Sequence, residues 1–500
     1  MQNKKIVIST LFVLLSLFVL ILSTGIPKGV YLSPDENSRD YLIHVLTDTG
    51  SLSEKKVDGE YYDLIKPRNA VSVNNTIVPK TSFGSLISRG LISIVVGFEN
   101  YFFVFSLIQA LLFSFFFYYL FKSKNKKKNQ LLLLVLFFIL VSPIRRYIIF
   151  PIPFVFALFY YFKRLLEDEK KRYAVLFSVC YFIIVLFRYE YIFLFSPVIL
   201  FALWFSNKKG TLIFSLFLSF IITVVFLLSM NFTYYQDPLS FGYSFDAKSQ
   251  DASYANTQQS IVSKVLSYLL PYGFQPSSFL DKGFRYIFVL FPFALLPLLF
   301  FLFLAPTKEK NMYQAFLASF LLFIIYYGSN PYFFNYDETT IDSSYTRYFF
   351  FLILFFIGGL AVSLSKLPPK LKFFSASILL ILLLGASVQE YTNRNAKLEY
   401  YLDQKEKVLS ETPENTIIFT DYWDKILWPE RLVATPSYRE ISDQELYDLL
   451  VRMNTKDNMT ILVNKDSKYF QRIDKMEKVE LEKMKNIDFY KVVFPKENSK

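Results

Sequence analysis

The sequence has little of the chemistry that metal and redox proteins use. It contains one cysteine, Cys180, and one histidine, His44, among 500 residues. These counts exclude an internal disulfide, a metal cluster built from cysteines, and a proton relay built from several histidines. Any chemistry must therefore use Asp, Glu, Arg, Lys and Tyr side chains.

Glycine and charged residues are also scarce. The 15 glycines are about 3% of the chain, against a usual ~7%. Membrane bundles whose helices slide past one another tend to be richer in glycine, so a moving transporter is disfavoured. Only 19% of the residues are charged and 53% are hydrophobic, which excludes a disordered chain.

What the chain does have is a series of long apolar runs. Runs near 20 residues can cross a hydrocarbon core of roughly 30 Å. The sequence therefore predicts a mainly α membrane protein, with about 11 transmembrane helices and an uncleaved first span. The predicted spans are 6–26, 101–121, 131–144, 148–162, 174–187, 191–205, 211–230, 286–305, 313–327, 348–364 and 373–388.

The short loops between these spans predict the orientation. Five of them are rich in Lys and Arg, which the positive-inside rule assigns to the cytoplasm. Much of the net charge of +12 lies there, so it requires no nucleic-acid partner. The N-terminus is then cytoplasmic and the C-terminus extracytoplasmic. The five basic loops are 122–130, 163–172, 207–210, 306–311 and 365–372.

The polar segments fall on the outer face. The predicted transmembrane domain covers residues 1–388, with outer loops at 27–100, 231–285 and 328–347. An apolar stretch at 86–97 is too short to span, and we expect it to form a helix in the outer interface.

Residues 389–500 form the second predicted domain, a small extracytoplasmic α/β domain. Three β-rich runs at 416–420, 459–463 and 488–494 predict strands, and 393–409 predicts a helix. A second helix is expected over 442–453, where Ser442 and Glu445 have the spacing of a capping box.

Two adjacent carboxylates, Asp35 and Glu36, follow the first span directly, and a helix is expected over 37–48. A carboxylate near the low dielectric of the membrane has a raised pKa. It is then a suitable general base for a hydroxyl, or a ligand for a divalent cation. The alternative is that Asp35 only caps the following helix.

Several arginines lie where the predicted spans reach the outer face. Guanidinium groups converging there would suit a phosphate. The alternatives are an internal ion pair between Arg188 and Glu190, and an interfacial anchor made by Arg347 with its tyrosine neighbours. The residues concerned are Arg145, Arg146, Arg188, Glu190, Arg347 and Tyr348.

Taken together, these features resemble the integral-membrane glycosyltransferases of the C superfamily, in particular the protein O-mannosyltransferase and aminoarabinose-transferase branch. The order of motifs along the chain carries the resemblance. They are Asp35-Glu36 and the stretches 78–84, 231–243, 346–348 and 421–431.

The resemblance implies a C-superfamily bundle and inverting transfer of a sugar from a polyprenyl-phosphate donor to an acceptor hydroxyl. Asp35 would take the proton of that hydroxyl, and Glu36 would bind the acceptor or a cation. Arg188 and Arg347 would stabilise the leaving phosphate. Lys80 is a further phosphate candidate.

The aminoarabinose-transferase branch holds a metal with a first-loop acid and a histidine from a later outer loop. This chain has no histidine beyond His44. No metal and no certain cofactor are therefore assigned, and a divalent cation stays open.

Two functions remain in view. The first is a cell-membrane glycosyltransferase of the outer face, with a lipid, glycan or protein acceptor. The second is a non-catalytic membrane protein, either a lipid or glycan flippase or a partner-binding scaffold. Few intramembrane charges and no visible inverted repeat weigh against transport.

Overall fold

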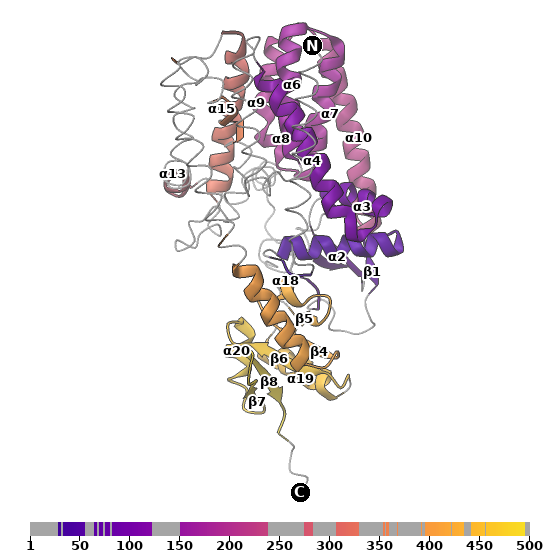
Figure 1. Cartoon of the computed structure of the whole chain (residues 1–500), viewed down its shortest axis with the longest axis vertical. Coiled ribbons are helices and arrows are strands. Elements are labelled where there is room, and N and C mark those ends of the chain that lie inside the picture. The colour runs from indigo at the N-terminus through magenta and orange to yellow at the C-terminus, as the bar shows by residue number, and fades with distance from the viewer. Residues whose placement is uncertain are drawn as a thin grey trace, which may run out of the picture. The chain divides into compact units, whose positions relative to one another are not determined.

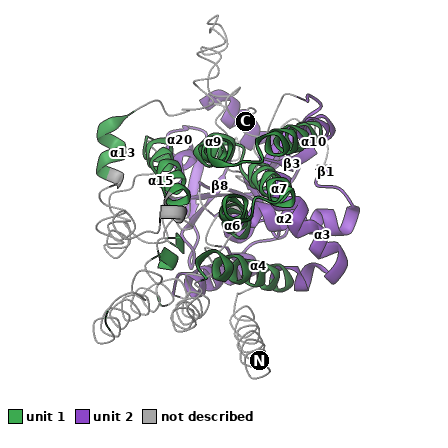
Figure 2. Ribbon diagram, turned by 90° about the horizontal axis from the view of Figure 1, so that it is seen from above, with its two compact units in different colours: residues 1–24, 103–225, 258–392 green, residues 25–102, 226–257, 393–500 purple. Residues whose placement is uncertain are grey.

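The structure is a computed structural model, and its chain separates into two compact units (Figure 2). Unit 1 comprises Met1–Thr24, Phe103–Val225 and Gln258–Thr392; unit 2 comprises Gly25–Phe102, Phe226–Thr257 and Asn393–Lys500. The structure describes residues 29–31, 34–55, 65–67, 70–73, 76–80, 83–122, 151–238, 275–283, 307–329, 354–355, 357–359, 368, 392, 396–421, 423–434, 442–455 and 457–495.

Unit 1 is helical throughout its described part (Figure 1). Two of its helices, α4 and α10, continue into residues of unit 2. The helices are α4 (Phe98–Phe121), α6 (Ile152–Asp168), α7 (Lys171–Phe187), α8 (Tyr191–Leu194), α9 (Ser196–Phe205), α10 (Lys209–Tyr235), α13 (Pro276–Gly283) and α15 (Thr307–Gly328).

Phenylalanine rings fill the core of unit 1. The Phe159 ring contacts the rings of Phe195, Phe316 and Phe355. Phe316 and Phe355 stack with centroids 3.8 Å apart. Aromatic rings bury a large apolar area and pack edge to face, so a chain poor in glycine can still close its helices tightly.

Three helices are long and apolar enough to cross a membrane: α4, α10 and residues Asn311–Gly328 of α15. The side chains of Phe214, Phe217 and Ile222 on α10 are each about 60% exposed (66%, 61% and 61%). A helix of this length with bare apolar side chains indicates a membrane protein. The predicted number of 11 spans is not reached among the described helices; spans 6–26, 131–144, 286–305 and 373–388 and most of 348–364 lie outside them.

The apolar helix expected over 191–205 is present as Tyr191–Phe205. A single turn residue, Phe195, lies two positions before Pro197 and divides it into α8 and α9. One boundary of the predicted topology is wrong. The expected loop 163–172 is largely helix, since α6 runs on to Asp168. Glu169 then ends the helix in the left-handed conformation, with φ 51°.

Unit 2 combines helices with two sheets (Figure 1). Its N-terminal part contains α2 (Pro34–Thr49), α3 (Phe83–Val96) and an antiparallel sheet. The strands of that sheet have the order β1-β3-β2, and they are β1 (Glu54–Lys55), β2 (Ala70–Val73) and β3 (Thr76–Pro79). The sequence predicted a helix over 37–48, which is three residues short of α2 at its start and one residue short at its end. It did not predict this sheet.

The C-terminal part of unit 2 confirms the predicted strands to within one residue. They are β4 (Thr416–Phe419), β6 (Thr460–Asn464) and β8 (Phe489–Val493). Two further strands, β5 (Leu432–Ala434) and β7 (Glu480–Lys483), complete a mixed sheet of order β5-β4-β6-β8-β7. A helix at 396–411 precedes the sheet.

Three helices lie between the strands: α18 (Asp424–Leu427), α19 (Asp443–Thr455) and α20 (Lys468–Ile473). The predicted capping box of α19 is present. The Ser442 N–H donates to Glu445 Oε2 at 2.7 Å, and the Glu445 N–H donates to Ser442 Oγ at 3.2 Å. These reciprocal bonds satisfy two backbone donors at the start of the helix.

The sequence placed a domain boundary at residue 389. In the structure Asn393–Lys500 share one unit with Gly25–Phe102 and Phe226–Thr257. The tail is therefore part of the same compact unit as the first outer loop, 27–100.

Candidate functional site

The acidic pair lies in the first turn of α2. The helix begins at Pro34, so Asp35 is its second residue and not the residue before it. Proline is favoured at the first helical position, where its missing N–H has no partner to lose. Carboxylates in this turn interact favourably with the positive end of the helix dipole.

One turn further along α2, Asp40 is held among hydroxyl groups. The Tyr101 hydroxyl, at the start of α4, donates a short hydrogen bond to Asp40 Oδ1. Tyr31 also forms a hydrogen bond with Asp40, and its pKa is raised by burial and by that carboxylate. Burial raises the pKa of Asp40 itself, while the bond from Tyr101 opposes the rise.

Two arginines complete this cluster. Arg89 of α3 is 7% exposed, and burial together with the charge of Arg39 lowers its pKa to about 10. It therefore stays protonated at neutral pH. Asp40 and Glu36 both oppose the fall in the pKa of Arg89, so the first turn of α2 and this guanidinium interact electrostatically. We call Tyr31, Glu36, Arg39, Asp40, Arg89 and Tyr101 the α2 cluster.

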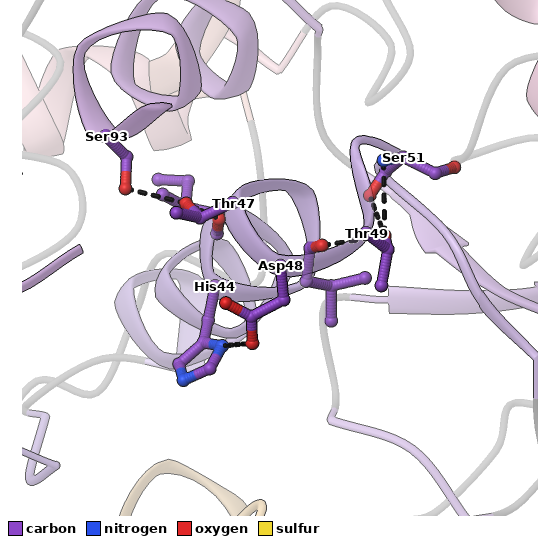
Figure 3. Close-up of polar contacts among 8 residues, drawn as sticks. His44, Thr47, Asp48, Thr49, Ser51 and Ser93 are labelled. Carbon is purple, nitrogen blue, oxygen red and sulfur yellow. Dashed lines mark hydrogen bonds and ion pairs between the residues drawn. The ribbon is translucent and has the colours of Figure 1, made fainter. Parts of the chain in front are cut away.

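Close packing of α3 against α2 brings Arg89 to this position. A Cβ atom on Gly90 would lie 2.2 Å from Leu46 Cδ2, so only glycine fits there without movement of Leu46. The Thr47 and Ser93 hydroxyls form a hydrogen bond of 2.7 Å between the same two helices (Figure 3). The next residues of α3 instead present apolar side chains to the surface: Leu91 is 60% exposed and Val95 81%.

The tail of the chain packs on the same helix. Asn37 Nδ2, on α2, donates to the Asp424 carbonyl oxygen of α18 at 2.6 Å. The Tyr31 N–H donates to the Lys425 carbonyl oxygen at 3.2 Å. The rings of Tyr41 and Trp428 meet edge to face, 5.4 Å apart. The motif at 421–431 therefore braces the first turns of α2.

A salt bridge lies beside this brace. Lys405 Nζ donates to Glu430 Oε1 at 2.6 Å and to the Gly29 carbonyl oxygen at 2.7 Å. Gly29 has φ 79°, a conformation that favours glycine, and a Cβ there would lie 3.0 Å from Lys405 Nζ. The chain just before α2 is thus held by the tail as well.

The other residues predicted for the site do not all lie in the α2 cluster. Glu36 belongs to the α2 cluster, and Asp35 is its neighbour in the helix. Lys80 follows β3 in the same unit and is 7% exposed. Arg145, Arg146, Arg347 and Tyr348 lie outside the described residues, as does the side chain of Asp35.

Arg188 and Glu190 lie in unit 1 and are paired with each other. Arg188 Nη1 is 3.0 Å from Glu190 Oε1, and the Tyr327 hydroxyl donates to the same oxygen at 2.9 Å. This is the internal ion pair that the sequence left as an alternative to phosphate binding.

His44 Nδ1 lies 2.7 Å from Asp48 Oδ2 on α2 (Figure 3). Both side chains are more than half exposed, at 54% and 56%. Among the residues that the structure describes, no group of three or more His, Cys, Asp or Glu could hold a metal ion.

Sequence reasoning missed Asp40, Arg89 and Tyr101. A usable signal was present, because Glu36 and Asp40 are four residues apart and so share one face of a helix. An arginine inside the apolar stretch 86–97 was a second signal, since a buried arginine requires an acidic partner.

Comparison with known proteins supports the fold. No family model matches the chain, and no curated protein matches it. Among solved structures it is similar to the archaeal oligosaccharyltransferase AglB from Archaeoglobus fulgidus, in complex with an inhibitory peptide and a dolichol-phosphate. The TM-score is 0.53 at 12% sequence identity, over 92% of this chain and 70% of that chain. The two proteins share a fold.

Proposed function

We propose that this protein is a membrane glycosyltransferase that moves a sugar from a polyprenyl-phosphate donor to an acceptor hydroxyl on the outer face of the membrane. The observation that carries the proposal is the likeness of fold to an oligosaccharyltransferase over 92% of the chain. That enzyme was solved with a dolichol-phosphate, which is itself a polyprenyl phosphate. A fold alone does not fix a reaction, so the chemistry must come from the site.

The α2 cluster and its neighbour Asp35 provide suitable groups. In the proposed reaction the acceptor oxygen forms a bond to the anomeric carbon while the bond to the lipid phosphate breaks. The Asp35 carboxylate takes the proton of the acceptor hydroxyl, and the phosphate leaves with the electron pair of the broken bond. Attack opposite the leaving group inverts the anomeric centre.

We assign Glu36 to binding of the acceptor or of a divalent cation. Asp40 and Arg89 position the first turn of α2 and do not themselves touch the substrate. Lys80 is proposed to bind the donor phosphate, on the basis of the family resemblance. Because Glu190 already accepts from Arg188 at 3.0 Å, we propose a structural role for that pair.

The proposal is tested by transfer of radiolabelled sugar from a panel of polyprenyl-phosphate donors in membranes that contain the protein. Asp35→Asn is expected to lose at least ~100-fold of the wild-type rate, as for removal of a general base. Asp48→Asn is the matched control, because Asp48 is an exposed aspartate on the same helix. It should retain the full rate.

Equal accumulation of all three proteins must be shown first. Full transfer by Asp35→Asn would overturn the assignment of the base. No transfer by the wild type from any donor would contradict the transferase and favour the flippase or scaffold.

A further inference from the structure

The sheet at the C-terminal end of the chain has a point where the strand order reverses. Strand β4 is the middle one of the three parallel strands, and the next two, β5 and β6, lie on opposite sides of it. In open sheets of this kind, ligands bind in the crevice outside the carboxyl ends of the strands at the reversal. Here that point lies between the ends of β4 and β6.

A hollow lies at the end of β6. Its volume is about 420 Å³, and its lining begins directly after the last residue of the strand. The lining continues along α20, which packs against β6 (Figure 1). The lining residues are Lys465, Asp466, Ser467, Lys468, Gln471, Arg472 and Lys475.

Hydrogen bonds fix the loop that forms this hollow. Ser467 Oγ donates to Asp421 Oδ1 at 2.9 Å, which joins the loop after β6 to the loop after β4. The Asp466 N–H donates to Asn464 Oδ1 at 3.0 Å, and Asn464 Nδ2 donates to the Asp488 carbonyl oxygen at 3.2 Å. The wall is therefore set before a ligand arrives, which lowers the entropic cost of binding.

The lining of the hollow carries more positive than negative charge. Four of its seven lining side chains are cationic and one, Asp466, is acidic. Asp443, 2.6 Å from Arg472 Nε, and Asp421, which accepts from Ser467, offset part of this charge. The other three cations of the lining are lysines. Lysine binds phosphate as a point charge. A divalent anion neutralises several neighbouring lysines better than a single carboxylate does.

We propose that this hollow, lined by Lys465, Lys468 and Lys475, is a binding site for a phosphate-bearing ligand. The source of the phosphate is either a lipid headgroup or a soluble phosphate ester. The site would let the tail hold an anionic substrate or the membrane surface. This inference goes beyond the proposed function, because phosphate binding is measured without sugar transfer.

The test is calorimetric titration of sodium diphosphate into the purified full-length protein in a neutral detergent. We call the hollow the groove in these experiments, and the groove variant carries Lys465→Gln, Lys468→Gln and Lys475→Gln. The control variant carries Lys478→Gln, Lys483→Gln and Lys485→Gln, which removes the same charge from exposed lysines outside the lining of the same domain. Thermal unfolding of both variants should match that of the wild type.

Diphosphate is expected to bind the groove variant at least ~10-fold more weakly, and to bind the control as it binds the wild type. Equal weakening in both variants would show general attraction to the net charge and overturn the site. Failure of the wild type to bind diphosphate would overturn it as well.

Two further titrations distinguish the sources once the groove dependence is established. Glycerol phosphate and short-chain dihexanoyl phosphatidic acid present the same phosphomonoester group, without and with acyl chains. Groove-dependent binding of both supports a soluble phosphate ester. Groove-dependent binding of the lipid alone supports a headgroup at the membrane surface.

Discussion

Two clusters of charged residues, one in each unit, are built on different plans. In unit 1 a single carboxylate, Glu190, is matched by one guanidinium and one hydroxyl, from Arg188 and Tyr327. In unit 2 the α2 cluster contains two carboxylates and two guanidiniums, and Asp40 at its centre has a raised pKa. In the second arrangement, Glu36 lies in the first turn of α2 beside Asp35, the residue that we propose as the general base.

The difference follows from how the acids are satisfied. A buried carboxylate next to another carboxylate is costly when both are ionised. Perturbed groups of this kind gather at functional sites, although structural networks produce them too. The predictions below test whether the two clusters really differ.

The largest effect is expected from Arg89→Met, which removes a buried guanidinium that attracts both Asp40 and Glu36. Loss of a buried opposite charge beside carboxylates costs about 3 kcal/mol. Arg188→Met in unit 1 is the matched change, and it should cost about 1 kcal/mol or less because Arg188 is 34% exposed. Denaturant unfolding of each purified variant measures the difference. Equal losses would remove the distinction between the clusters.

A smaller loss is expected from Gly90→Ala, which separates α3 from α2. The new Cβ would lie 2.2 Å from Leu46 Cδ2, at the far end of a flexible side chain. Displacing Leu46 should cost about 1 to 2 kcal/mol. Gly210→Ala on α10 has no atom within 4 Å of its Cβ, so the unfolding free energy should stay level or rise. A Gly90→Ala protein as stable as the wild type would contradict the close packing of α3 against α2.

The pH dependence of stability tests the raised pKa of Asp40. Because burial raises the pKa of this carboxyl above that of an ordinary aspartate, the folded state holds the proton more tightly than the unfolded state does. The resulting stabilisation is complete below the unfolded pKa and is lost as the pH rises through the folded pKa. Each tenfold decrease in the acid dissociation constant of Asp40 on folding corresponds to about 1.4 kcal/mol of this stabilisation.

Asp40→Asn cannot lose that proton, so its unfolding free energy should vary less than that of the wild type from pH 4 upward. Fluorescence of Trp423 and Trp428, both in unit 2, reports the unfolding of that unit when Trp204 of unit 1 is replaced by phenylalanine in both proteins. Parallel pH profiles for the two proteins would contradict the raised pKa.

The smallest effect is expected from Asp48→Asn, which breaks the exposed pair with His44. Exposed ion pairs contribute little, and the change in unfolding free energy should stay below about 0.5 kcal/mol. A loss comparable with that of Arg89→Met would mean that an exposed contact on α2 stabilises the protein as much as a buried charge does.

The sequence predicted those features that local patterns determine. The apolar run at 101–121 became α4, and the spacing of Ser442 and Glu445 gave the start of α19. Strands β4, β6 and β8 appeared where β-branched and aromatic residues gather. These elements depend on periodicity and capping, which are properties of neighbouring residues.

The α2 cluster could be predicted only in part. Glu36 lay in the acidic pair, but the surroundings of Asp40 come from Tyr101 and Arg89, which are 61 and 49 positions further along the chain. The contact of Asn37 with Asp424 spans 387 positions. The hydrophobic periodicity of a short stretch of sequence cannot predict such contacts, because they form when elements distant in the sequence pack together.

The most direct test of the account compares the two glutamates, one from each cluster, in the sugar-transfer assay. Both are changed to glutamine, so the chemical change is the same. After correction for folded protein, Glu36→Gln should lose at least ~10-fold of the transfer rate and Glu190→Gln should stay within ~3-fold of the wild type. A large loss in Glu190→Gln with full transfer by Glu36→Gln would place the chemistry in unit 1 and contradict the account.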